Sequence, residues 1–132
     1  MVPDGTTGAF RRSDRLLDSR DFRRVLRRGR RRASRELVVV VSENPGKINQ
    51  SGDLHPNSRL GITVSRKVGN AVVRNRFKRR IRAWFRAHRA ELVPPVDLVV
   101  IARRPGGQLG LSELDARLRK LLALEPVGGR HG

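Results

Sequence analysis

The side chains with the most pronounced chemical character in this sequence are bases gathered between residues 74 and 89. Eight Lys and Arg residues lie there, seven of them arginine, and no acid occurs between residues 71 and 90. Soluble helices ordinarily mix the two signs, because like charges four residues apart destabilise a helix. The guanidinium group suits bidentate contact with phosphate and stacking on nucleobases. The segment therefore predicts a surface that binds nucleic acid.

The start of this basic segment, Arg74-Asn75-Arg76, has the form of a phosphate-binding site. It falls in the first turns of a predicted helix over residues 70–88, where free backbone N–H groups and the helix dipole favour an anion. The Asn75 amide can donate and accept hydrogen bonds between the two arginines. The alternative, that Asn75 is an ordinary polar surface residue, stays open.

Groups that could cleave a phosphodiester bond are not gathered in the sequence. Metal-assisted cleavage ordinarily needs clustered carboxylates, whereas the acids here stand singly or near helix starts, as Asp21 and Glu113 do. His55, His88 and His131 lack metal-ligand spacing, and no phosphate-binding loop of the form G-x-x-x-x-G-K occurs. We therefore expect no active site in the chain itself, and the residues leave open whether it binds a metal.

Composition narrows the class of partner. The 132-residue chain has a net charge of +18, which predicts a polyanionic partner because a folded core has no need of such a charge. Leu, Ile, Val and Phe make up about 29% of the residues, enough for a folded body, and the length fits one domain. There is no cysteine and no apolar run long enough to cross a membrane. These features predict a cytoplasmic protein without membrane contact.

Hydrophobic periodicity predicts the elements that carry these residues. In chain order they are a helix over 19–28, strands over 30–35, 36–42 and 59–65, a helix over 70–88, a strand over 96–102 and a helix over 112–124. Residues 43–58 and 103–110 are predicted as a loop or long hairpin connection and as a turn-rich loop. The order α-β-β-β-α-β-α predicts the α+β class, as a single two-layer sandwich with a central sheet packed against helices.

Alternation within these elements predicts which faces are buried. One sector of about 120° on the helix over 70–88 carries its large apolar residues, which are Val73, Phe77, Ile81, Trp84 and Phe85. The strand over 59–65 has an open face of small or polar residues, which are Gly61, Thr63 and Ser65. Ser112 with Asp115 resembles a capping box for the last helix. Residues 10–125 are expected to form an RNA-binding domain between flexible tails at 1–9 and 126–132.

Three stretches together resemble the protein subunits of bacterial ribonuclease P. They are SRDFRRVLRRG at residues 19–29, RLGITVSRKVGNAVVRNRFKRRIRAWFR at 59–86 and DLVVIARRP at 97–105. The similarity covers roughly residues 10–124, with the same order of elements. An isolated Arg-Asn-Arg would mean little, but here Ser-Arg-Lys-Val-Gly-Asn precedes it, and the combination is highly specific.

The resemblance implies a function and a detail of the fold. Members of this family are small basic subunits, expected as monomers, that bind the catalytic RNA of ribonuclease P and the 5′ leader of precursor tRNA. The complex cleaves off the leader, and the RNA with its Mg²⁺ ions performs the chemistry. The resemblance also implies that the basic helix lies in a left-handed β-α-β crossover, whereas the general rule for such connections favours the right-handed form.

The resemblance further implies two sets of binding residues. Binding of the catalytic RNA falls to Arg74, Asn75, Arg76, Lys78, Arg79 and Arg82. Binding of the leader falls to a cleft between the first helix and the sheet, with Phe22, Leu26, Val40, Thr63 and Lys67. Leu26 and Val40 stand where many members carry aromatic rings, and stacking on a ring is worth about 1–3 kcal/mol per base. Phe22 remains as a stacking platform, with packing against the sheet as its alternative.

Two other classes of function are compatible with a basic chain. A ribosomal or other structural RNA-binding protein without a role in cleavage has the same composition, and it stays open as the alternative. A polybasic surface for anionic membranes needs exposed apolar residues beside its charges. The large apolar residues of the basic helix are required for the core, so the membrane alternative is the weaker one.

Overall fold

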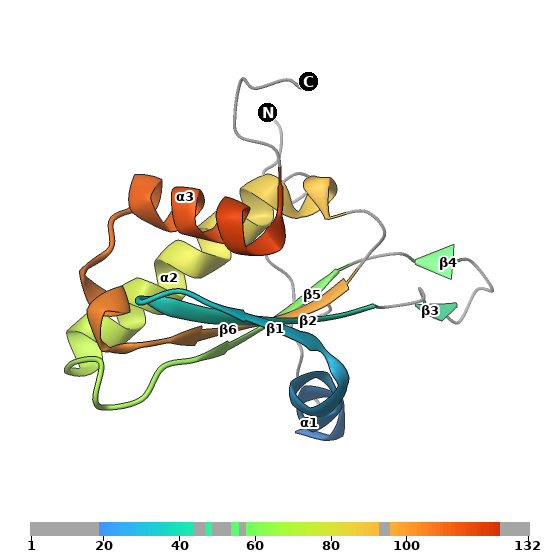
Figure 1. Ribbon diagram of the computed structural model, residues 1–132, viewed down its shortest axis with the longest axis horizontal. Helices are drawn as coiled ribbons and strands as arrows, with labels where there is room; N and C mark the ends of the chain where they lie inside the picture. Colours follow the sequence, from blue (N-terminus) through green and yellow to red (C-terminus); the bar gives the residue numbers. More distant parts are fainter. Residues whose placement is uncertain (1–18, 44–46, 49–53, 56–57, 93–95, 125–132) are drawn as a thin grey trace, which may run out of the picture.

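The chain folds around a four-stranded sheet that carries helices on both of its faces (Figure 1). The computed structural model describes residues 19–43, 47–48, 54–55, 58–92 and 96–124. The predicted tails at 1–9 and 126–132 lie outside this part of the chain. No helix within it is long and apolar enough to cross a membrane.

The elements follow the predicted order closely. They are α1 (Ser19–Arg28), β1 (Arg30–Ala33), β2 (Leu37–Glu43), β3 (Lys47–Ile48), β4 (Leu54–His55), β5 (Arg59–Thr63), α2 (Ala71–His88), η3 (Arg89–Glu91), β6 (Val96–Ala102), η4 (Arg104–Gln108) and α3 (Leu111–Leu122). The predicted connection over 43–58 contains the short antiparallel pair β3–β4. The turn-rich loop over 103–110 contains the 3₁₀ helix η4.

The sheet has the strand order β1-β2-β6-β5. Strand β2 pairs antiparallel with both β1 and β6, whereas β5 pairs in parallel with β6. Helix α2 connects the two parallel strands, so β5, α2 and β6 form the predicted β-α-β unit. The left-handed sense of this crossover stays a prediction.

Helices cover both faces of the sheet because β2 and β6 are apolar on both faces. Leu37 and Val39 of β2 pack in the main core with α2 and α3, whereas Val38 and Val40 pack in a smaller cluster with Val25 of α1. Figure 1 shows α1 alone on one side of the sheet and the other two helices on the opposite side. The mixed α+β fold is as predicted, and α1 adds a layer to the predicted two.

Helix α2 buries the apolar sector that the sequence predicts. Phe77, Ile81, Trp84 and Phe85 are buried, and Val73 packs against the same core while partly exposed. The helix begins after Asn70, whose side-chain oxygen accepts a hydrogen bond from the Val73 backbone N–H at 3.0 Å. This side-chain cap satisfies one of the free donors of the first turn.

The predicted capping box of the last helix is wrong. Helix α3 begins at Leu111, and the backbone N–H of Gly110 donates to Oε1 of Glu113 at 3.0 Å. Asp115 instead accepts hydrogen bonds from the indole N–H of Trp84 at 2.8 Å and from Nε of Arg119 at 3.0 Å. The carboxylate of Asp115, which the local spacing assigns to the helix cap, therefore makes a tertiary contact with α2.

Candidate nucleic-acid interface

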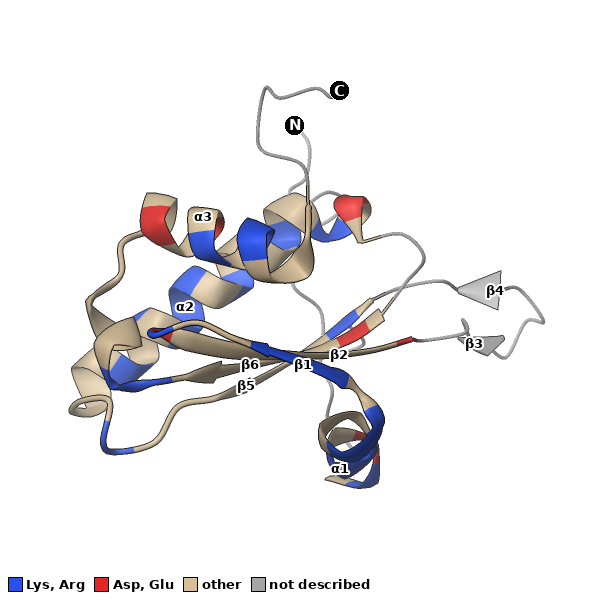
Figure 2. Cartoon of the chain, in the orientation of Figure 1, with Lys and Arg blue, Asp and Glu red and all other residues tan. Residues whose placement is uncertain are grey.

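Helix α2 carries basic residues along its length and no acid, as the blue segments of its ribbon show (Figure 2). Asn75 and Arg79 are exposed, and Lys78 and Arg82 are half-buried beside them. There is no acid in the first turn of the helix, so the positive end of its dipole is not offset there. The structure thus brings the predicted residues together on one helix, with the helix N-terminus at one end of the surface.

Three arginines of α2 also contact neighbouring backbone. Nε of Arg74 donates to the Gly69 carbonyl at 3.2 Å, just before the helix. Arg76 donates from Nη2 to the Gly107 carbonyl at 3.3 Å, and Arg80 from Nη1 to the Leu109 carbonyl at 2.6 Å. Arg76 and Arg80 thereby attach η4 to α2. Sequence spacing does not reveal the contacts of Arg76 and Arg80, because their carbonyl partners lie in a loop 31 and 29 residues further along the chain.

Arg76 keeps part of its hydrogen-bonding capacity. Its Nε is buried and has no hydrogen-bond partner within the described part of the chain. An unpartnered buried donor is costly. Arg76 therefore combines a structural contact through Nη2 with a buried Nε that no described residue satisfies.

The glycine at position 107 allows η4 to lie this close to α2. A Cβ built on Gly107 would lie 2.8 Å from Cγ1 of Val73 and 3.0 Å from Cγ1 of Val68. Any side chain would push the loop away and lengthen the bond from Arg76 to the Gly107 carbonyl. The backbone of η4 approaches α2 this closely only because residue 107 has no side chain.

Most of the residues assigned to the leader lie on the opposite face of the sheet, which α1 partly covers. Phe22 packs against the cluster formed around Val25, and Leu26 is 38% exposed. Thr63 is exposed and pairs in register with Ile101, which packs against the same cluster as Phe22. The exposed Lys67 follows β5 in the next turn. Val40, in contrast, is fully buried beneath α1, with no surface for a ligand.

A buried network of charges holds α1 against this face, and local sequence patterns give no sign of it. Asp97 is fully buried and accepts hydrogen bonds from Arg24 at 2.6 Å and from Arg59 at 2.8 and 2.9 Å. Asp21 joins Arg24 at 3.1 Å and Arg59 at 3.2 Å. The hydrogen bond with the Asp97 carboxylate raises the pKa of Arg59 above its already high ordinary value. The network fixes α1, and therefore Phe22, on the sheet.

Comparison with known proteins decides the family. The sequence profile of the family described as Ribonuclease P matches residues 10–124. The chain belongs to the ribonuclease P protein family. It is 37% identical to the ribonuclease P protein component of Bacillus velezensis over 112 residues, which cover 85% of this chain and 89% of that protein. It is also 37% identical to the component from Geobacillus thermodenitrificans over 115 residues, which cover 87% of each.

Solved structures of family members have the same fold. The RNase P protein from Staphylococcus aureus aligns with a TM-score of 0.69 at 34% identity, over 83% of this chain and 93% of that one. The protein from Thermotoga maritima aligns with a TM-score of 0.67 at 29% identity, over 85% and 98% of the two chains. The family and the fold class expected from the sequence are thus confirmed. Family membership makes the chain a protein component of ribonuclease P, the endoribonuclease complex of tRNA 5′ maturation.

Proposed function

We propose that this chain is the non-catalytic subunit of that complex and that the ribonuclease P RNA, with its Mg²⁺, cleaves the precursor tRNA. The observation that carries the proposal is the acid-free basic surface of α2, which begins at Arg74-Asn75-Arg76 and suits an RNA backbone. The described residues include no group of three His, Cys, Asp or Glu side chains placed to hold a metal ion. In this proposal the protein is a monomer in the cytoplasm, and the Mg²⁺ belongs to the RNA.

Helix α2 is the part that docks on the catalytic RNA in this proposal. The residues that make contact are Arg74, Asn75, Arg76, Lys78, Arg79 and Arg82. The helix N-terminus and the guanidinium groups of its first turns hold one phosphate, and the exposed bases along the helix hold further ones. Each neutralised phosphate releases counterions, so binding weakens steeply as salt is added.

The face that carries α1 holds the 5′ leader of the precursor. Phe22, Leu26, Thr63 and Lys67 are accessible there, and Val40 supports α1 from beneath. The precursor carries the leader and the mature tRNA does not. Contacts with the leader therefore strengthen binding of the substrate and are absent from the complex with the product. The protein thereby contributes to catalysis by favouring substrate over product, without touching the bond that is cleaved.

Cleavage of precursor tRNA at low Mg²⁺ tests the subunit assignment. We compare the cognate RNA alone, the protein alone and the two together, and we expect efficient cleavage only from the combination. Cleavage by the purified protein alone would overturn the assignment. Absence of any stimulation would instead favour the structural RNA-binding protein without a role in cleavage.

A pair of exposed residues tests the docking surface. The double variant N75A/R79Q removes polar groups that have no structural contact in the described part of the chain. We expect about a ten-fold or larger loss of affinity for the catalytic RNA, because two side chains that contact the RNA phosphate backbone are lost. Lys120→Gln, an exposed charge on α3, is the control and should change affinity much less. Equal effects of the two variants would remove α2 from the interface.

Leader length tests the second face. The holoenzyme should bind a precursor with a leader of several nucleotides more tightly than one with a single-nucleotide leader, and Thr63→Glu should reduce that difference because its carboxylate repels the leader phosphates. Mature tRNA serves as the control, because it lacks a leader and its affinity should not respond to the substitution. Affinity that is indifferent to leader length would contradict the assignment of this face.

A further inference from the structure

A second group of arginines lies at the other edge of the sheet from β5. It spans the last turn of α1, strand β1 and the turn after it. All six of its members are exposed, and they are Arg27, Arg28, Arg30, Arg31, Arg32 and Arg35. Their side chains have no ion pair or hydrogen bond with any described residue. Figure 2 shows this basic edge running from α1 into β1.

The strand order separates this group from the surface of α2. Strands β1 and β5 are the two edges of the sheet, with β2 and β6 between them. Helix α2 lies on the side of β5 and η4, where Arg76 and Arg80 attach it to the loop. The arginines of β1 are therefore not an extension of the docking surface already described, and a different segment of ligand has to reach them.

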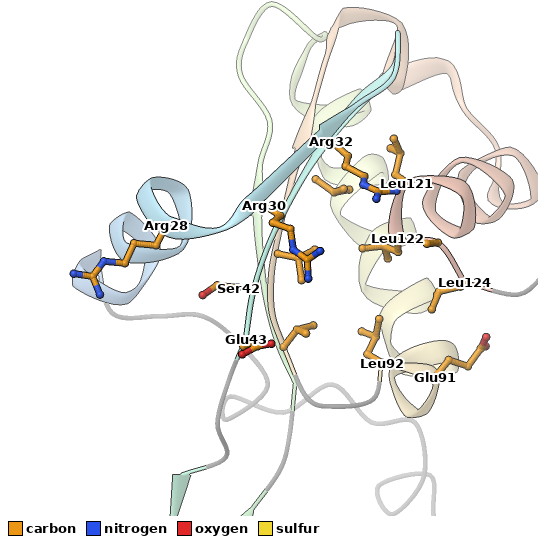
Figure 3. A pocket seen from close by; sticks show the side chains of 14 residues that line it. Arg28, Arg30, Arg32, Ser42, Glu43, Glu91, Leu92, Leu121, Leu122 and Leu124 are labelled. Carbon is orange, nitrogen blue, oxygen red and sulfur yellow. The ribbon is translucent and has the colours of Figure 1, made fainter.

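A cavity opens beside β1, between the sheet and the end of α3 (Figure 3). Its volume is about 610 Å³, within the range of about 300–1,000 Å³ that is usual for small-ligand sites. Arg30 and Arg32 pair in register with Val41 and Val39, which places all four on the face toward α3. Figure 3 shows Arg30 and Arg32 extending over the cavity, whereas Arg28 points away from it.

The floor of this cavity is aliphatic. The partly exposed Val41 of β2 lines one side above the buried Val39, and Leu92, Leu121 and the partly exposed Leu122 line the other. Of its two acids, Glu91 is held by Arg119 at 2.9 and 3.2 Å, and Glu43 is exposed. The site therefore combines two guanidinium groups with an apolar surface, a pairing that suits a flat ring attached to an anion.

Simpler roles explain the charges but not the cavity. Bases on an edge strand prevent pairing with another chain, and bases in the last turn of a helix complement its dipole. Neither role requires an open apolar space beneath Arg30 and Arg32. A nucleotide has the required parts, since its base stacks on guanidinium and aliphatic groups while its phosphate pairs with arginine.

We propose that this cavity binds one unpaired nucleotide of an RNA strand that runs along β1. The base lies between the two arginines of the rim and the leucines of the floor, and Arg28 and Arg31 contact the adjacent phosphates. The inference uses the proposed function only in taking RNA as the partner. The strand belongs either to the precursor or to the catalytic RNA, which present the same chemistry.

Binding of a short RNA to the full chain tests the proposal. The probes are a fluorescent oligoribonucleotide of about eight residues, an abasic strand of equal length and inorganic polyphosphate. The variant R30Q/R32Q should weaken binding of the oligoribonucleotide about ten-fold and narrow its advantage over the abasic strand. The control R104Q/K120Q removes two exposed charges that do not line the cavity. An equal loss in the control would overturn the proposal.

A second variant and a second measurement separate a base in the cavity from charge at its rim. Leu122→Gln makes one wall of the cavity polar without removing charge or adding a ring on which a base could stack, so it should weaken binding of the oligoribonucleotide and leave polyphosphate binding unchanged. Methyl NMR should show shifts at Leu121 and Leu122 with the oligoribonucleotide but not with the abasic strand. Equal shifts with both strands would show that no base enters.

The variant R30Q/R32Q, tested in the holoenzyme, identifies which RNA supplies the strand. If the variant loses affinity for the precursor to a degree that depends on leader length, the strand belongs to the precursor. If it instead binds the catalytic RNA more weakly, the strand belongs to the RNA subunit. The proposed function is judged by stimulation of cleavage, whereas this site is judged by binding of oligoribonucleotide to the protein alone. Failure of one is therefore distinguishable from failure of the other.

Discussion

Asp97 has no exposed surface and accepts hydrogen bonds from two arginines that come from different elements. A buried carboxylate costs a large desolvation free energy, and close guanidinium groups offset it only when the geometry is complete. Arg59 is adjacent on β5, and Arg24 reaches across from α1. At the scale of single residues, Asp97 is therefore the buried carboxylate that joins α1 to β5.

Asp97→Asn should lower the free energy of unfolding by about 3 kcal/mol, because it leaves Arg24 and Arg59 with only the partly exposed Asp21 as their anion. Urea denaturation measures the change. Glu91→Gln is the matched control, since Glu91 is 39% exposed and the buried Arg119 keeps its bond to Asp115, so the loss should cost less than about 1 kcal/mol. Equal costs would mean that the Asp97 network contributes no more than a surface pair.

Glu36 gives the molecule a pH dependence in the acid range. Hydrogen bonds from Arg117 lower the pKa of Glu36 below its ordinary value of 4.5. A carboxylate with a depressed folded-state pKa stabilises the fold above its unfolded pKa, and that contribution is lost as the pH falls through the folded value. Melting between pH 7 and pH 3 should show this loss, and Glu36→Gln should flatten part of it. An unchanged pH profile in the variant would contradict the linkage.

At the scale of elements, α2 depends on the close approach of η4. Gly107→Ala should destabilise the fold by about 1–3 kcal/mol, because its Cβ would overlap the side chains of Val73 and Val68. Gly110→Ala is the matched control, since its Cβ would meet only Oε1 of Glu113 at 3.8 Å. Thermal melting compares the two variants. Equal melting temperatures would show that the loop moves away without cost.

The elements themselves follow from the sequence where a long periodic pattern covers them. The 18 residues of α2 and the apolar run of β2 gave nearly correct bounds, because burial of one or both faces dominates there. The predicted start of α3 at residue 112 differs from the observed start at Leu111, because the prediction takes Asp115 as part of a capping box. In the structure Asp115 accepts a hydrogen bond from Trp84 instead. The charge network around Asp97 and the cavity beside β1 both join residues far apart in sequence, and local patterns carry no information on such contacts.

At the scale of the whole molecule, repulsion among the charges that give a net +18 opposes folding. Sulfate at millimolar concentration should raise the melting temperature by about 5 °C, since an anion that binds only the folded state stabilises it. Chloride at equal ionic strength is the control, because it screens charge without occupying a phosphate site. The same rise with both salts would show that screening accounts for the effect.

The central position of β6 has a consequence for synthesis of the protein. Strands β1 and β2 are consecutive and pair without any later segment, but β5 pairs only with β6, and β6 is the last strand of the sheet in chain order. A nascent chain that has not yet released residue 102 from the ribosome therefore exposes β5 and one edge of β2, with α2 lacking most of the surface it packs on. The sheet closes in one late step, so the basic surfaces acquire their final arrangement only when nearly the whole domain has been made.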